Sequence, residues 1–133
     1  MKQGYAAHIE TLALENENFR QVLYTAEHCQ LVLMSLLPGE EIGLETHTEG
    51  DQFFRFEKGQ GKVMISGVEH LVGNGDAVII PSGTEHNVIN VSTTEKLKLY
   101  TLYAPAHHKD GVVRATRAEA MADGPEFDGV TTE

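Results

Sequence analysis

The chain has 133 residues, 41% of them hydrophobic and 23% charged, a composition typical of one globular domain. It carries 20 acidic residues against 10 Lys and Arg, so its formal net charge is −10 at pH 7. A chain this acidic lacks the basic surface that nucleic acid or an anionic membrane would need. It has no apolar run long enough for a membrane span or a signal peptide, and its single cysteine, Cys29, cannot form an internal disulfide. We therefore expect a cytoplasmic protein.

Short β-strands dominate the predicted elements. Apolar and β-branched runs alternate with turn signals such as Pro38-Gly39, Gly73-Asn74-Gly75 and Pro81-Ser82-Gly83. The N-terminal segment 1–25 is also strand-like as a whole. Strands are predicted at 19–25, 29–37, 52–57, 62–66, 69–72, 76–81, 86–91 and 96–104. This spacing of strands and turns predicts an all-β sandwich or barrel.

One helix is predicted near the end of the chain. Thr116 and Glu119 have the spacing of a capping box, and the helical pattern continues until Asp123-Gly124-Pro125. The last residues, 129–133, are expected to be loose. The chain is thus predicted to be a single domain over 1–133, with a core barrel at about 19–104 and a tail with a helix at 105–133.

Four residues could supply ligands to a metal ion. Glu45 and His47 share one face of an extended strand, because residues two apart in a strand point the same way. A hairpin that turns at residues 49–51 would bring Gln52 beside His47, and His86 follows a later Pro-x-Gly turn. Together they offer two imidazoles, a carboxylate and an amide oxygen. The alternative is a polar turn with an incidental histidine.

The other five histidines have no partners at informative spacing. We expect them to be surface or hydrogen-bonded side chains. An alternative for the last two is a position over the mouth of the barrel, since they follow the last predicted strand. These histidines are His8, His28, His70, His107 and His108.

Two motifs of fixed spacing surround the candidate ligands. Residues 39–59 read G-x5-E-x-H-x4-Q-x6-G, and residues 75–90 read G-x5-P-x-G-x2-H-x3-N. These motifs resemble, in the same order, the two motifs of the cupin superfamily, of which the first is G-x5-H-x-H-x3–4-E-x6-G. Every position of the second motif matches. In the first, Glu45 replaces a histidine and Gln52 replaces the glutamate.

The resemblance implies a fold and a ligand set. The fold would be an all-β jelly-roll barrel, the double-stranded β-helix of a small single-domain cupin, and such cupins are usually dimeric. By carry-over of the motif, Glu45, His47, Gln52 and His86 would bind a divalent metal ion. This donor set suits iron or manganese, which we favour, and also nickel, cobalt or zinc. Among small cupins the chain looks most like those called mannose-6-phosphate-isomerase-like.

The strand pattern also predicts a pocket beside the ligands. Phe54 and Phe56 share a face with Gln52, whereas Val88 and Asn90 share a face with His86. We expect these four side chains to line a site for a small molecule, although core packing of the phenylalanines and a structural hydrogen bond from Asn90 are alternatives.

The expected function is that of a metal-dependent enzyme acting on a small oxygen-rich metabolite. The substrate would be a sugar, a uronate or a keto acid, and the reaction of isomerase, lyase or dioxygenase type. A non-catalytic cupin that binds a metal or a small molecule is the alternative, and a cupin without metal is a third hypothesis. The outward-facing Phe53 and Arg55 and the strand-like N-terminal segment predict a homodimer.

Overall fold

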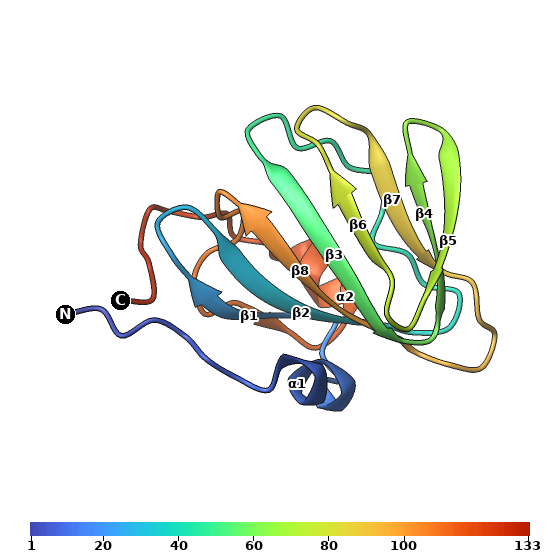
Figure 1. Ribbon diagram of the computed structural model, residues 1–133, viewed down its shortest axis with the longest axis horizontal. Helices are drawn as coiled ribbons and strands as arrows, with labels where there is room; N and C mark the ends of the chain where they lie inside the picture. The colour runs from blue at the N-terminus through green and yellow to red at the C-terminus, as the bar shows by residue number, and fades with distance from the viewer.

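Two antiparallel β-sheets pack into a barrel in the computed structural model, which describes residues 1–133 (Figure 1). The larger sheet has the strand order β6-β3-β8-β2-β1-β9, and the smaller sheet has the order β5-β4-β7. The elements are α1 (Ile9–Glu15), β1 (Arg20–Thr25), β2 (Gln30–Leu36), β3 (Asp51–Lys58), β4 (Gln60–Ile65), β5 (Val68–Gly73), β6 (Ala77–Ile80), β7 (His86–Asn90), β8 (Leu97–Ala104), β9 (Val113–Arg114) and α2 (Arg117–Ala122).

The predicted all-β jelly-roll barrel with a short C-terminal helix is confirmed. Each predicted strand is present, and α2 begins at the predicted capping box, where the Thr116 side chain accepts a hydrogen bond from the Glu119 backbone N–H at 3.1 Å. The Glu119 carboxylate in turn accepts from the Ala115 N–H at 3.0 Å. The first bond satisfies an N–H group that the first turn of a helix leaves unpaired, and the second holds the residue just before the N-cap. Neither α1 nor α2 is long and apolar enough to cross a lipid bilayer.

The prediction of a strand-like N-terminal segment is wrong over Ile9–Glu15, which forms α1. Ile9, Leu12 and Ala13 stand at helical spacing, and Ala13 is fully buried. The helix contacts β2, β3 and β8 of the larger sheet (Figure 1). An apolar stripe of one short helix is a weak local signal, and its burial against a sheet decides the structure.

The hydrophobic core lies between the two sheets. Alternate residues of β3 point inward, so that Gln52, Phe54 and Phe56 are all buried. Phe54 and Phe56 stack with ring centroids 6.3 Å apart. Val63 and Val88 of the smaller sheet belong to the same buried cluster. Gln52 is thus a polar side chain on an otherwise apolar inner face.

An irregular segment before β3 extends the smaller sheet. Glu41 pairs with Ile89 and Glu45 with His86 as isolated antiparallel bridges, and the Ile42 N–H donates to the Val88 carbonyl at 2.9 Å. The predicted hairpin between the Glu45–His47 stretch and β3 is therefore wrong. Both edges of β3 are already paired, with β6 and with β8, and the segment follows β7 instead.

The C-terminal segment 105–127, here called the strap, pairs with β1 through β9 and is also held by one buried amide. The Gln30 side chain on β2 is fully buried, accepts from the backbone N–H groups of His107 and His108, and donates to the His108 carbonyl at 2.7 Å. The Phe127 N–H donates to the His107 carbonyl at 3.0 Å. The strap therefore has a defined position over the barrel.

The expectation of a loose end at 129–133 is wrong. The Thr132 N–H donates to the Thr25 carbonyl at 2.9 Å, and the Glu133 carboxylate accepts from the backbone N–H groups of Gln3 and Gly4. These contacts bring the two ends of the chain together at one end of the molecule (Figure 1). The sequence signal is weak because the partners of Thr132 and Glu133 lie more than a hundred residues away along the chain.

A cluster of charges fastens the end of α1 to the outer face of β8. The Lys98 side chain is buried, and its ammonium group donates to the Asn16 carbonyl and, at 3.0 Å, to the Glu17 carboxylate. Lys96 also donates to Glu17. Hydrogen bonds from Lys96 and then from Lys98 lower the pKa of Glu17 from 4.5 to about 2. The folded state therefore favours the ionised carboxylate.

We predict that Glu17→Gln makes the stability of the protein less sensitive to a fall in pH. The pKa of Glu17 is about 2 in the folded state against an ordinary 4.5, so its contribution is present above pH 4.5 and is lost as the pH falls toward 2. The variant should have a lower Tm at neutral pH and a shallower fall of Tm in acid. Thermal unfolding followed by circular dichroism measures both. Glu15→Gln, which removes an exposed carboxylate without an ion pair, is the control. Parallel curves for Glu17→Gln and the wild type would contradict the prediction.

Candidate metal centre

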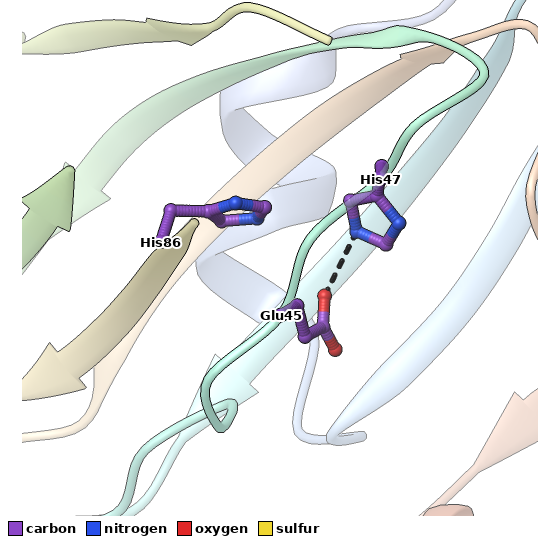
Figure 2. Close-up of side chains that lie close together, drawn as sticks. All are labelled: Glu45, His47 and His86. Atoms are coloured by element: carbon purple, nitrogen blue, oxygen red, sulfur yellow. Dashed lines mark hydrogen bonds and ion pairs between the residues drawn. The ribbon is translucent and has the colours of Figure 1, made fainter. Parts of the chain in front are cut away.

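Glu45, His47 and His86 come together inside the barrel. One ligand atom from each lies within 4.8 Å of the other two, which positions the three residues to form a metal site. His47 Nε2 and Glu45 Oε2 are 2.9 Å apart, and the His86 ring faces this pair from the opposite strand (Figure 2). The centroids of the two imidazole rings are 5.3 Å apart. An imidazole pair and a carboxylate at this separation can converge on one ion.

The backbone fixes the three residues relative to one another. The Glu45 N–H donates to the His86 carbonyl, and the His86 N–H donates to the Glu45 carbonyl, each at 2.9 Å. His47 lies two residues beyond Glu45, and its carbonyl accepts from the Gly83 N–H at 2.8 Å. The Gly83 position has a φ of 79°, which glycine adopts without strain, so the turn before β7 can close onto His47.

The hydrogen bond on the far side of His86 determines which nitrogen faces the site. Nδ1 lies 3.0 Å from the Thr84 carbonyl, which can only accept, so Nδ1 carries the proton. In the neutral imidazole Nε2 then carries no proton and presents a lone pair. This atom is buried and has no hydrogen-bond partner in the protein. A buried acceptor without a partner is costly, and metal-ligating histidines have this kind of second hydrogen bond.

A hydrogen bond also fixes the orientation of the Gln52 side chain. The Thr101 hydroxyl donates to the Phe53 carbonyl at 2.8 Å, so its oxygen is left to accept from Gln52 Nε2 at 3.0 Å. The NH2 group of the Gln52 side chain is thereby hydrogen-bonded, and the carbonyl oxygen Oε1 is directed away from Thr101. Oε1 is buried and has no hydrogen-bond partner. Gln52 and His86 therefore each present an unpaired acceptor to the interior.

Two neighbours of Gln52 lie near the two histidines of the site. Gln52 lies across from Tyr103 in the β3–β8 register and next to Phe54 on the inner face of β3. The Tyr103 ring is 5.9 Å from the His47 ring, and the Phe54 ring is 6.4 Å from the His86 ring. Gln52 therefore lies between the residues that contact the two imidazoles.

Opposing effects act on the carboxyl group of Glu45. Burial is the largest cause and raises its pKa, but the hydrogen bond with His47 and electrostatic interactions with His47, His86 and Arg20 together outweigh burial. The pKa of Glu45 is lowered as a result. The site thus favours a carboxylate, which is the form that binds a metal ion.

The structure places His107 against the site. Its ring centroid is 4.5 Å from that of His47 and 5.3 Å from that of Tyr103, with the rings of His107 and Tyr103 stacked. This is the alternative position over the barrel mouth. His108 is buried behind it, with Nε2 3.2 Å from the Tyr103 hydroxyl. The other three lone histidines are exposed, as expected.

Burial shifts the pKa values of the polar groups around His107. It lowers the pKa of His107, and it lowers that of His108 to about 2, so both imidazoles are favoured in the neutral form. It raises the pKa of Tyr103, whose phenol is therefore favoured in the protonated state. The sequence signal for this group was only the position of the two histidines after the last strand.

A cavity of about 380 Å³ leads to His47. Its walls come from residues 46–51 and from the strap, and Tyr103, His107 and Glu126 supply polar groups. The side chains predicted to line a pocket lie deeper. Phe54, Phe56 and Val88 are in the core. The Asn90 amide donates to the carbonyls of Leu36 and Leu37 at the end of β2 and to that of Glu95 before β8, the last at 2.8 Å. Their contact with a ligand stays a prediction.

Three comparisons with known proteins agree on the family. The profile of the Cupin_2 family, described as "Cupin domain", matches residues 32–103. The chain is 44% identical over 124 residues to protein YrkC of Bacillus subtilis, with 89% of this chain and 66% of YrkC covered, slightly less than two thirds of that relative. It is 40% identical over 126 residues to protein L612 of Acanthamoeba polyphaga mimivirus, with 92% and 78% covered. Both relatives are described as uncharacterized.

A solved crystal structure has the same fold, and its sequence identity to this chain is similar to that of the two relatives. The crystal structure of protein BH2720 from Bacillus halodurans superposes with a TM-score of 0.88 and 41% identity, covering 91% of this chain and 96% of that one. The family profile, the relatives and the barrel thus agree with the motifs around Glu45 and His86. The chain belongs to the cupin family, as a cupin-2 domain protein.

Proposed function

We propose that the protein is a metal-dependent cupin enzyme whose ion is bound by Glu45, His47, Gln52 and His86. The observation that carries this proposal is the pair of unpaired, buried acceptors, His86 Nε2 and Gln52 Oε1. Each is held by a hydrogen bond on its other side, which leaves it no freedom to find a protein partner. A cation between the four side chains would satisfy both atoms at once.

The types of ligand atom limit which metal ions would suit the site. Two imidazoles, one carboxylate and one amide oxygen contain no thiolate, so they suit iron or manganese, which we favour, and also nickel, cobalt or zinc. A divalent ion with Glu45 as its single anionic ligand keeps a net charge of about +1. In a poorly solvated barrel this charge attracts an anionic oxygen group of a ligand.

The proposed substrate is a small oxygen-rich metabolite, such as a sugar, a uronate or a keto acid. When bound, a divalent ion here would supply a Lewis acid for a carbonyl oxygen or hold a chelating substrate. The protein's own groups bind and orient the ligand: His107 and Tyr103 form one wall of the cavity, and neutral imidazole and phenol groups can exchange hydrogen bonds with it. The reaction would be of isomerase, lyase or dioxygenase type.

A non-catalytic cupin that binds metal and a small molecule is the second candidate. The names of the related proteins assign no reaction, and Glu45, the only carboxylate among the proposed ligands, would be occupied by the ion. The homodimer and the cytoplasmic location stay predictions. Light scattering at micromolar concentration tests the first of these, because a homodimer would have twice the mass of the chain.

Turnover separates the two candidates. Protein reconstituted with each first-row metal is incubated with uronates, 2-keto acids and sugar phosphates, and products are followed by NMR. The enzyme proposal expects conversion of at least one compound, and none with a folded His86→Ala variant. Tight metal binding without any conversion would favour the binding protein.

We predict that His47→Ala and His86→Ala each abolish stable metal binding in a folded barrel. Even changes in residues behind a metal ligand cost about 10–100-fold in affinity, so loss of a ligand should cost more than about a hundredfold. The barrel should persist because neither residue belongs to the hydrophobic cluster. Titration calorimetry with manganese measures affinity, and circular dichroism measures folding. His70→Ala, at an exposed position on β5, is the control and should bind like the wild type.

We predict that Gln52→Glu binds divalent metal more tightly and anionic ligands more weakly. An anionic oxygen is a stronger donor than an amide oxygen, and a gain of about tenfold in metal affinity corresponds to only 1.4 kcal/mol. The same charge removes the net +1 that attracts an anion such as oxalate. Paired titrations of metal and then oxalate measure both effects. Unchanged affinities in both titrations would show that Gln52 is not a ligand.

A further inference from the structure

The cavity beside His47 has carboxylates on its walls and no lysine or arginine. None of the 12 residues that line it is Lys or Arg, although the chain has 10 of these residues. Glu49, Asp51 and Glu126 do line it, and all three are exposed to solvent, whereas His47 is half-buried. These three side chains are here called the rim carboxylates. Their exposure places them at the mouth of the cavity.

The loop that carries two of the rim carboxylates is held on both sides. The Ser82 N–H donates to the Asp51 carboxylate at 2.9 Å, and the Ser82 hydroxyl donates to the Thr48 carbonyl at 2.8 Å. On the other side, Gly50 packs so closely on the end of β8 that a Cβ there would lie 2.5 Å from the Ala104 carbonyl oxygen. The loop at residues 48–51 therefore has a defined place in the cavity wall.

The third rim carboxylate comes from the strap. Glu126 forms an isolated antiparallel bridge with His108, and the next residue, Phe127, donates its N–H to the His107 carbonyl at 3.0 Å. The His107 ring in turn lies against His47, with 4.5 Å between the ring centroids. Both walls of the cavity, the loop and the strap, thus contribute carboxylates to its mouth.

The inner end of the same cavity reaches the candidate metal centre. His47 lines the cavity, and one ligand atom each of Glu45 and His86 lies within 4.8 Å of a ligand atom of His47. His86 is only 2% exposed, and its Nε2 has no hydrogen-bond partner, which points to a cation at this end independently of the rim. The proposed ion keeps a net charge of about +1. The cavity would then be positive inside and negative at its mouth.

This order of charges distinguishes ligands by their own charge. One carboxylate of a ligand can neutralise the ion. A second negative charge finds no lysine or arginine on the cavity wall and comes close to three carboxylates, a repulsion that low-dielectric walls strengthen and salt weakens. A neutral molecule leaves the charge of the ion without a partner. The pattern therefore favours a ligand with a single negative charge.

We propose that the ligand of the metal centre is a small monoanion, with one carboxylate at the ion and an uncharged remainder toward the mouth. The rim carboxylates exclude phosphorylated and dicarboxylate compounds. This inference rests on the proposed function, because it uses the residual charge of the ion. Among the substrates considered there, it favours uronates and 2-keto acids over sugar phosphates and neutral sugars.

The test uses pairs of acids that differ at the end away from the metal. The pairs are glycerate and 3-phosphoglycerate, gluconate and 6-phosphogluconate, and 2-hydroxybutyrate and malate. Each compound keeps a 2-hydroxy acid that can chelate the ion, and the second of each pair adds negative charge. Calorimetric titration into manganese-loaded wild type at low ionic strength should give the monoanion an affinity higher by about tenfold or more. In about 0.3 M salt this preference should shrink by about threefold or more.

The rim variant combines Glu49→Gln, Asp51→Asn and Glu126→Gln. The amide groups keep the size of the side chains, and Asp51→Asn keeps an oxygen that can accept from the Ser82 N–H. The affinity for the more highly charged acid of each pair should rise more than that for the monoanion. The preference should therefore fall by about fivefold or more at low ionic strength. Circular dichroism checks that the variant is folded.

The matched control combines Glu10→Gln, Glu15→Gln and Glu95→Gln. It removes the same number of exposed carboxylates, and none of them lines the cavity. Its preference should equal that of the wild type. An equal fall in both triple variants would reduce the effect to the net charge of the protein and overturn the proposal. A preference that neither salt nor the rim variant changes would come from shape, and would also overturn it.

A manganese titration of the wild type separates this inference from the proposed function. Absence of manganese binding would overturn both. Manganese binding with equal or higher affinity for the more highly charged acids would overturn the inference alone, and so would failure of all three monoanions to bind. If the rim variant does not fold, Glu126→Gln takes its place, with an expected fall in preference of about twofold. No fall in Glu126→Gln and none with salt would overturn the proposal.

Discussion

The reciprocal backbone hydrogen bonds between Glu45 and His86 hold together two segments that are distant in the sequence. They add an irregular segment to the edge of the smaller sheet beside β7, so the side chains of Glu45 and His86 lie next to each other on one face. His47 reaches the same face because it lies two residues beyond Glu45. The site does not rest on a hairpin of its own. Ile42 of this segment and Val88 of β7 belong to the hydrophobic core between the two sheets, and this packing keeps the segment beside β7.

A few buried polar atoms in the barrel interior have no hydrogen-bond partner. Most buried polar atoms in it are paired, and Gln30 and Asn90 each satisfy several backbone groups of the loops and the strap. The exceptions include His86 Nε2, Gln52 Oε1 and Arg20 Nε. His86 Nε2 and Gln52 Oε1 are both acceptors, so one cation between them would satisfy both. A folded protein tolerates such a cost where a ligand offsets it.

Much of the fold could be predicted from the sequence, because strands and turns have strong local signals and the motif spacing is specific. The helix α1 was not, since its short apolar stripe gains its energy from packing on the sheet. At the site, Glu45, His47 and His86 were predicted as a group, but the hairpin to β3 was not correct, because strand pairing depends on which edges are free. His107 lies outside the motifs. Tertiary packing alone brings its ring against that of His47.

The proposed function requires one divalent ion between Glu45, His47, Gln52 and His86. The most direct measurement is anomalous X-ray diffraction from crystals of the untagged protein grown with manganese. We expect a single strong anomalous peak within coordination distance of His47 Nε2, His86 Nε2, Gln52 Oε1 and a Glu45 carboxylate oxygen. A crystal that contains manganese at another position, or an interior with no peak at saturating metal, would contradict it.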